Sequence, residues 1–449
     1  MSFTKQQYFA SLKQTLQIGL PIMASHLGHV LMGFFDTVQI GGLGAQYIAA
    51  TGLASTVYWR LTLLGTGVLF VVAPLVSAAF GEKNEAKAIG IFKSSLRLAT
   101  WISIIFTSLF FFFIYHFEIF GQSQQVNTIA SRYLLIVNLT TPAMIFFTAG
   151  RQLLEGMGKT MPGMVINIGA LLLNILLNDI LIYGKLGLPP LGVTGAALAT
   201  SISRVAMLLA VFVYIYNNRF ILQLFKKHSQ AAAATIGYVF PILSMGIPAS
   251  LQVFSEAAAF SVAHIMSGWL GEIELAAHQI AINLASMTFM AIAGISAAGT
   301  VITGFGLGAK NKEQIILSGR TTIALTLLLE ITFLLCFFLF YRQLPFLYTN
   351  NTEVVAMAST LILLAVFFQL SDGAQNVAVG LLRGLQDVKV PAILAFTAYW
   401  LVMIPACYLL AFKTSLGIKG IWIGFTIGLS TASVILLLRY RYVLHKLKF

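Results

Sequence analysis

Long apolar segments alternate with short polar loops along the whole chain. The apolar segments run for about 20 residues or more, which is enough for a helix to cross a bilayer, and loops with Gly, Pro or Asn separate them. Helices satisfy their own backbone hydrogen bonds in lipid, so we expect every span to be helical. The pattern predicts an all-α protein with twelve transmembrane helices, near 14–40, 47–76, 95–118, 129–152, 162–184, 193–216, 239–267, 274–306, 318–342, 354–381, 391–412 and 418–439.

Composition supports a polytopic membrane protein. The 449 residues are 58% hydrophobic and only 9% charged, with a mean hydropathy of +0.89. A soluble domain carries about 25% charged residues. The start of the chain, MSFTKQQYFASLKQTLQ, is polar and lacks a short apolar core with a cleavage site. We therefore expect no cleaved signal peptide, and the first span would direct insertion.

The distribution of basic residues predicts the topology. Of the 27 Lys and Arg, twenty fall at one side of the predicted spans, two lie inside spans (Arg60 and Arg204) and the rest lie at the other side. The positive-inside rule then places both termini in the cytoplasm and the chain in the cytoplasmic (inner) membrane. The net charge of +13 therefore does not indicate nucleic acid, because no basic stretch is interleaved with aromatic residues.

The chain repeats itself at an offset near 227. Gly19-Leu20-Pro21 matches Gly246-Ile247-Pro248, and Gly81 with Lys83-Asn84 matches Gly308 with Lys310-Asn311. Each half holds six predicted spans, so both halves have the same orientation. We predict six-helix lobes at 1–216 and 239–449, joined by a cytoplasmic linker at 217–238. Parallel repeats of this kind are related by a pseudo-two-fold axis along the membrane normal, with a cavity between the lobes.

Three carboxylates interrupt long apolar segments: Asp36, Glu256 and Asp372. A charge at mid-bilayer costs about 2.5–3.5 kcal/mol on insertion scales, so such a group usually faces a partner, a cavity or an ion path. Glu330 also lies in an apolar segment, but with no polar residue nearby a structural contact explains it as well as a function. The residues expected to support the three carboxylates are Asn174, Asn178, Thr200, Gln369 and Asn376.

Clusters rich in oxygen suit a hard cation such as sodium, or a proton carried by a carboxylate. We therefore interpret Glu256, Asp372 and Asp36 as cation-binding or coupling residues. For each of them the alternative is a structural hydrogen bond that locks two helices together.

With these residues in view, the sequence resembles the multidrug and toxic compound extrusion family, and within it the NorM-type exporters. The resemblance covers essentially the whole chain. It rests on motifs that are specific only in combination on a six-plus-six repeat. These are Gly19-Leu20-Pro21, Met32-Gly33-Phe34-Phe35-Asp36-Thr37, Asn174-Ile175-Leu176-Leu177-Asn178, Pro248 with Ser255-Glu256, and Asp372 with Gly380-Leu381-Leu382-Arg383-Gly384.

The resemblance implies a two-lobed antiporter that exports cationic or amphipathic compounds in exchange for sodium or protons. It implies a monomer in the lipid bilayer, a substrate site in the central cavity, and no cofactor beyond the coupling ion. Glu256 and Asp372 look like the family's cation-binding carboxylates, with sodium as the metal. Asp36, Asn174, Asn178 and Thr200 look like the polar cluster of the N-terminal lobe. Where some relatives have Tyr, this chain has Phe368, which removes one oxygen ligand and leaves sodium and proton both open.

Two other functions compete with this interpretation. A flippase for lipid-linked oligosaccharides has a related architecture, but its pyrophosphate cargo favours a cation-rich cavity, whereas the intramembrane charge here is mainly acidic. An intramembrane aspartyl enzyme would use Asp36 and Asp372 as a pair. The sequence has no Gly-x-Gly-Asp, His-Glu-x-x-His or Gly-x-Ser-x-Gly motif to support an enzyme.

Overall fold

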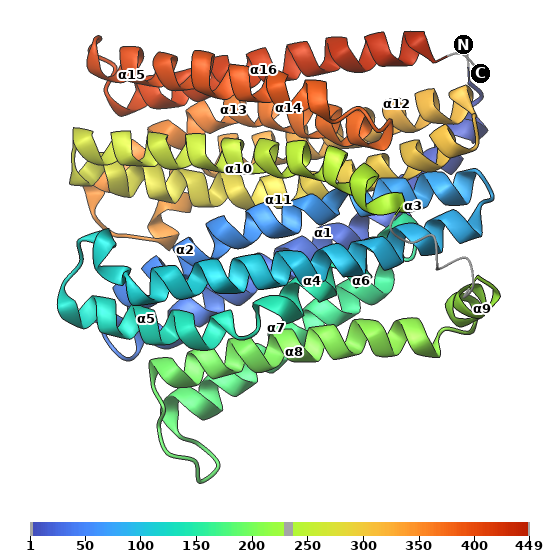
Figure 1. Ribbon diagram of the computed structural model, residues 1–449. Helices are drawn as coiled ribbons and strands as arrows, with labels where there is room; N and C mark the ends of the chain where they lie inside the picture. Colours follow the sequence, from blue (N-terminus) through green and yellow to red (C-terminus); the bar gives the residue numbers. More distant parts are fainter. Residues whose placement is uncertain (1–2, 229–236, 448–449) are drawn as a thin grey trace. The chain divides into compact units, whose positions relative to one another are not determined.

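The computed structural model describes residues 3–228 and 237–447, and the described elements are all helical (Figure 1). Twelve helical segments are long, and three of them each combine two α-helices within a segment that is bent or locally irregular. In chain order the segments are α1 (Lys5–Gly41), α2 with η1 and α3 (Ala45–Gly67, Val68–Val71, Val72–Gly81), α4 (Glu85–Tyr115), α5 with α6 (Gln124–Asn138, Thr141–Gly156), α7 (Met161–Tyr183), α8 (Val193–Asn217), α10 (Val239–Leu270), α11 (Glu272–Gly308), α12 (Lys312–Phe340), α13 (Thr352–Gly384), α14 with η5 and α15 (Lys389–Thr397, Ala398–Met403, Ile404–Phe412) and α16 (Ile418–Lys446).

These segments have the length and composition of membrane spans. Among the described residues, ten helices are long and apolar enough to cross a bilayer, and α5 with α6 makes an eleventh span that is bent by 45°. Pro142 stands in the first turn of α6, where a missing N–H costs nothing. The twelfth segment, α10, has 32 residues and a single Asp, Glu, Lys or Arg, which is Glu256. The chain is therefore an all-α, multi-pass membrane protein, as the sequence pattern predicts.

The repeated Lys-Asn pairs mark the same structural junction in both halves. Asn84 caps α4 by accepting a hydrogen bond from the backbone N–H of Lys87 at 3.0 Å, and Asn311 caps α12 in the same way through Gln314 at 3.0 Å. The preceding residues, Lys83 and Lys310, have positive φ angles of 55° and 53°. A tight turn followed by an Asn N-cap therefore explains why the repeat is visible at these positions.

By internal packing the chain divides into two units, one of residues 24–250 and one of residues 1–23 with 251–449. The divisions after Met23 and after Ser250 are themselves 227 residues apart, so they fall at equivalent positions of the repeat. The units differ from the predicted lobes, because the first part of α1 packs in the unit that holds α11–α16. The predicted linker contains the short helix α9 (Arg219–Lys227), and its residues 229–236 lie outside the described residues.

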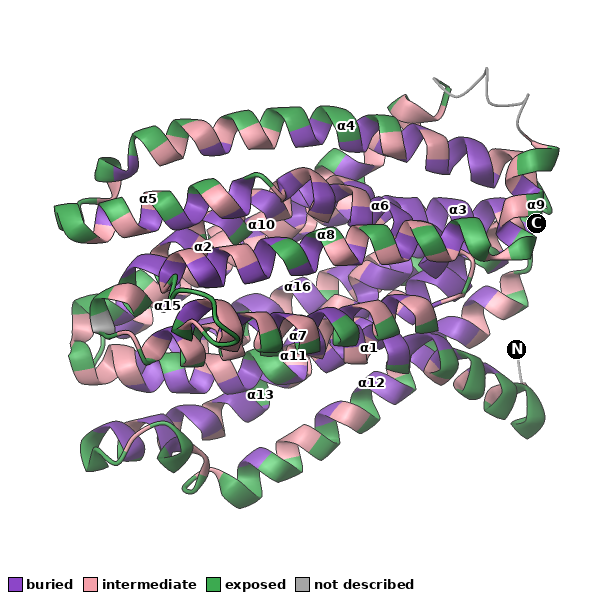
Figure 2. Ribbon diagram, turned by 90° about the horizontal axis from the view of Figure 1, so that it is seen from below, coloured by how far each residue is buried: buried purple, intermediate pink, exposed green. Residues whose placement is uncertain are grey.

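Each unit has its own apolar core. In the unit of 24–250, α7 packs along α8 and α4 along α6, and the rings of Tyr58 and Phe110 stack with centroids 5.1 Å apart. In the other unit, α11 packs along α13 and α13 along α16, around Trp422 and Phe425. Figure 2 shows that helices such as α4 carry both buried and exposed positions along their length. The exposed apolar faces suit contact with lipid.

Glycines allow close helix contacts, and two of them lie in matching motifs of the repeat, Gly192-Val193-x-Gly195 and Gly417-Ile418-x-Gly420. A Cβ on Gly195 of α8 would overlap the backbone of Leu181 in α7, and a Cβ on Gly420 of α16 would overlap the backbone of Leu410 in α15. Small residues at such crossings allow the backbones of membrane helices to approach closely. The repeat therefore preserves a backbone contact as well as a motif.

Replacing Gly195 with Val tests this contact. We expect Gly195→Val to destabilise the protein by about 1–3 kcal/mol, because the new side chain meets backbone rather than a movable side chain. The measurement is the thermal unfolding midpoint of the purified protein in detergent. Gly169→Val on α7 is the control, because nothing lies within 4 Å of the Cβ that it adds. Equal midpoints for the two variants would contradict a tight α7–α8 contact at Gly195.

Candidate functional site

Asp36 is the centre of a polar cluster in the unit of residues 24–250. Asn178 on α7 donates to Asp36 Oδ1 at 2.6 Å, and Thr200 on α8 donates to Asp36 Oδ2 at 3.4 Å. Asn174, one helical turn before Asn178, accepts from it at 3.4 Å. The structure thus brings together all four residues that the sequence assigned to the N-terminal cluster, and three different helices supply them.

Arg204 belongs to the same cluster, although the sequence analysis did not include it. It is buried, its guanidinium lies 4.3 Å from the centroid of the Tyr58 ring, and its charge acts on Asp36. A cation over an aromatic face is stabilised by the ring quadrupole. Its position four residues after Thr200 was the available signal, because residues at that spacing share a helix face. Asp36 therefore has a positive charge in its own surroundings.

Glu256 and Asp372 come together in the other unit. Gln375 on α13 donates to Glu256 Oε1 on α10 at 3.1 Å, which ties the two helices together. The charges of Glu256 and Asp372 act on each other, and the charge of Arg383 acts on Glu256. Asp372 is buried and Glu256 is partly exposed. The two carboxylates thus lie close enough for their charges to interact.

The two supporting residues predicted on α13, Gln369 and Asn376, contact α11 rather than the carboxylates. Gln369 donates to Thr288 of α11 at 2.9 Å, so it braces α13 against α11. For Asn376 the recorded contact is through its backbone oxygen, which accepts from Ser296 at 2.8 Å. Within the described residues, no hydrogen bond joins either side chain to Glu256 or Asp372. Gln375, which is not among the supporting residues predicted above, is the α13 amide that reaches a carboxylate.

Glu330 does have polar neighbours, contrary to the expectation from its sequence. It is 1% exposed, its carboxylate lies against Gly373 of α13, and its charge acts on Asp372, the residue before that glycine. Thr322 and Thr326 precede it at intervals of four residues and are also buried. This spacing was the missed signal, because it puts all three on one face of α12.

None of the four intramembrane carboxylates forms an ion pair with a side chain in the described ranges, 3–228 and 237–447. By contrast, the buried Glu155 pairs with Arg151 at 3.2 Å, and Asp387 pairs with Arg439 at 2.7 Å. In the same ranges no three His, Cys, Asp or Glu side chains are arranged to hold a metal ion.

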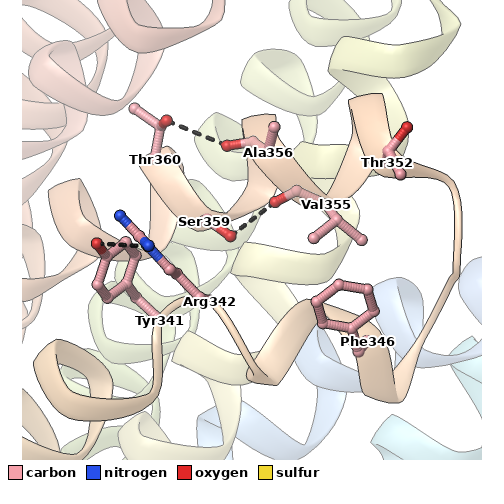
Figure 3. Close-up of a pocket in the computed structure, with 8 residues that line it drawn as sticks. All are labelled: Tyr341, Arg342, Phe346, Thr352, Val355, Ala356, Ser359 and Thr360. Atoms are coloured by element: carbon pink, nitrogen blue, oxygen red, sulfur yellow. Dashed lines mark hydrogen bonds between the residues drawn. The ribbon is translucent and has the colours of Figure 1, made fainter.

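A surface cavity of about 470 Å³ lies where α12 leads through η4 (Leu344–Leu347) into α13 (Figure 3). Its lining includes Arg342, whose Nε donates to the hydroxyl of Tyr341 at 2.9 Å, together with Phe346 and Thr352. None of the predicted site residues lines this cavity. It is therefore separate from the carboxylate site.

The comparisons with known proteins identify the family. The MatE family model matches residues 21–180 and 248–409, so its two matches start 227 residues apart. The chain belongs to the multidrug and toxic compound extrusion (MATE) family. It is 32% identical over 448 residues to the multidrug resistance protein MdtK of Yersinia pseudotuberculosis, with 98% of this chain and 97% of that protein covered. The MdtK protein of Yersinia enterocolitica is likewise 32% identical over 449 residues, with the same coverage.

Solved MATE structures share this fold. A MATE crystal structure in the straight conformation has a TM-score of 0.88 at 22% identity, covering 99% of both chains. The eukaryotic MATE transporter AtDTX14 has a TM-score of 0.87 at 19% identity, covering 98% of this chain and 99% of that one. Members of the MATE family are transporters, so this MATE protein is a membrane transporter and not an intramembrane aspartyl enzyme.

The hydrogen bond between Asn178 and Asp36 can be tested by a double-mutant cycle. We expect Asn178→Leu to lower stability by about 1.5–3 kcal/mol, because a partly buried carboxylate loses a donor. In an Asp36→Asn background the same substitution should cost less, since the charged acceptor is gone. The measurement is the unfolding free energy of the four proteins in detergent. Effects that add within about 0.5 kcal/mol would contradict a direct interaction.

Proposed function

We propose that this MATE protein is a secondary antiporter that exports cationic or amphipathic drugs and toxic compounds in exchange for sodium. Glu256 and Asp372 would bind the coupling cation, and Asp36 would be a second ion or proton site. Asn174, Asn178 and Thr200 would hold Asp36 in place, while Gln375 would do the same for Glu256. Gln369 and Asn376 would support the α13 side of the cation site.

The observation that carries the proposal is that neither Glu256 nor Asp372 forms an ion pair with a side chain of the described residues. Both lie in apolar helices, and the hydrogen bond to Glu256 comes from the neutral amide of Gln375. An anion in such surroundings is costly unless a cation compensates it. A mobile cation that binds in one state and leaves in another provides that compensation and couples it to transport.

The cargo class follows from charge and from the relatives. The curated relatives are named multidrug resistance proteins, and we extend that activity to this chain. An acidic intramembrane region attracts cations and repels anions, which favours cationic cargo over the pyrophosphate of a lipid-linked sugar. A flippase for lipid-linked oligosaccharides is correspondingly disfavoured.

Alternating access would couple the two movements. Coupling requires only that ion and substrate favour different states of the protein. If one positive charge moves inward without compensation, a membrane potential of 100 mV supplies about 2.3 kcal/mol. That free energy supports a concentration ratio of about 50, since about 1.4 kcal/mol corresponds to tenfold. In this proposal the protein works as a monomer of two six-helix lobes with both termini in the cytoplasm.

Dye efflux from proteoliposomes tests the coupling ion. A sodium gradient and a pH gradient are imposed separately, and the movement of a fluorescent cationic dye is followed. We expect the sodium gradient alone to drive the dye, because the site combines carboxylate and amide oxygens that suit a hard cation. A pH gradient alone driving the dye would overturn the choice of sodium.

Charge removal tests the two proposed ligands. We expect Glu256→Gln and Asp372→Asn each to abolish sodium-driven efflux, because each removes a full negative charge from the cation site. The control is Glu353→Gln, which removes an exposed acid from the first turn of the same helix as Asp372. Expression levels and unfolding midpoints of the variants are matched first. Full sodium-driven efflux in Glu256→Gln or Asp372→Asn would reject the site.

A further inference from the structure

The short helix α9 lies crosswise to the spans at one end of the unit of residues 24–250. Figure 1 shows α9 nearly end-on, whereas α8 runs across the view. It packs against α8 and α4, at the end of the spans that the positive-inside rule assigns to the cytoplasm. A helix placed in this way lies along the membrane surface, and no part of the proposed transport mechanism uses it.

One face of α9 holds it against the protein. Ile221 is fully buried, and the ring of Phe225 lies 5.8 Å from the ring of Phe92 on α4. At the end of α9, Lys227 Nζ donates to Oε2 of Glu85 at the start of α4, at 3.0 Å. The apolar side of α9 is therefore used for docking, and its other side is left to face the surroundings.

The outward side of α9 is cationic. Arg219 and Lys226 are exposed and stand seven residues apart, a spacing that puts them on one side of a helix. Within the described ranges neither forms an ion pair with an acidic side chain. The sequence has no Asp or Glu between Asp179 and Glu256, so neither α8 nor α9 supplies an acid to neutralise them.

Lys159, in the turn between α6 and α7, brings a third positive charge to the start of α9. Its Nζ donates to Asn218 Oδ1 at 3.4 Å and lies 4.9 Å from the centroid of the Phe220 ring. Arg219 is the residue between these two contacts. An ammonium carries three N–H donors, so one hydrogen bond to Asn218 leaves donors for a ligand. An ammonium beside a guanidinium suits the oxygens of a phosphate group.

An exposed apolar stripe on α8 leads to this cationic region. Its large side chains recur at intervals of three or four residues, which places them on one face of the helix. We call these residues, each 39–63% exposed, the α8 stripe: Ile202, Val205, Leu209, Val213 and Tyr216. Phe220, which is 48% exposed, continues the stripe onto α9. Aromatic residues such as Tyr216 and Phe220 are typical of the boundary between lipid tails and headgroups.

We propose that α9, Lys159 and the α8 stripe form a binding site for an anionic phospholipid. The phosphate contacts Lys159 and Arg219, Lys226 adds attraction for the negative headgroup, and an acyl chain lies along the stripe. Basic residues on a helix at the membrane surface bind anionic lipids through charge and apolar contact together. A water-soluble anion has no use for the stripe, and a zwitterionic lipid gains little from three cations. The proposal goes beyond the transport function and does not depend on the coupling ion.

Lipid titration of the purified full-length protein tests this site. Dioleoyl phosphatidylglycerol is added to the protein in a neutral detergent, and native mass spectrometry gives the affinity of the most tightly held lipid. We expect Arg219→Gln combined with Lys226→Gln to weaken binding by about tenfold or more, because each basic residue near an anionic lipid contributes about fivefold. The control combines Lys5→Gln with Lys13→Gln, which removes two exposed cations from the start of α1. Equal losses in the two double variants would indicate a general effect of charge and overturn the site.

Two other ligands separate the headgroup charge from the acyl chain. Dioleoyl phosphatidylcholine has the same chains and a zwitterionic headgroup, and we expect it to bind more weakly by about tenfold or more. Free glycerol 3-phosphate has the phosphate without the chains, and it should not displace phosphatidylglycerol. Equal affinity for phosphatidylcholine, or displacement by glycerol 3-phosphate, would overturn the proposal. If the double variant on α9 folds poorly, Lys159→Gln removes a charge from a different element, and full affinity in the folded Lys159→Gln protein would reject the site as well.

Discussion

The cost of an ionised carboxylate in an apolar interior governs the chemistry of this protein. Asp36, Glu256, Glu330 and Asp372 all lie in helices that are otherwise suited to lipid, and no Lys or Arg of the described chain forms an ion pair with them. Each must be compensated by neutral donors, by a more distant cation or by an ion from solution, or be neutralised by a proton. The polar residues and the glycines around these carboxylates help to offset the cost of burying them.

The two repeats compensate their intramembrane carboxylates in different ways. Asp36 has Asn178, Thr200 and the charge of Arg204 around it, so much of its compensation comes from the protein itself. At the equivalent position of the second repeat, 227 residues on, stands Ala263. The second unit gathers its carboxylates from other helices and leaves them in excess. The two repeats therefore share backbone features, such as the N-caps Asn84 and Asn311, but their charged sites differ.

Periodicity and composition predicted the helices, their number and the repeat, because a span in lipid must be apolar over a fixed length. The family resemblance, rather than periodicity, implied that Asp36 lies with Asn174, Asn178 and Thr200. Periodicity and composition could not predict that Gln369 would donate to Thr288 or that Glu330 would lie against Gly373, the residue after Asp372. Those contacts depend on how helices distant in sequence rotate against one another. For Glu330 the decisive detail is one glycine on a neighbouring helix, Gly373, which has no signature in the sequence near Glu330.

The division of α1 between two packing units has a consequence for synthesis. Residues 1–23 leave the ribosome first, yet Gly19 packs on Ile295 and Ser11 bonds to Thr321 at 2.9 Å, 310 positions later. The unit of 24–250 can complete its packing once residues up to Ser250 have left the ribosome, whereas the other unit needs residues 1–23 together with residues 251–449. Residues 1–23 therefore lack their native packing partners until residues 251–449 have been made. If the chain were cut between the two repeats, the first fragment would contain the whole unit of 24–250, but its residues 1–23 would lack their packing partners. The second fragment would lack residues 1–23, which belong to its unit.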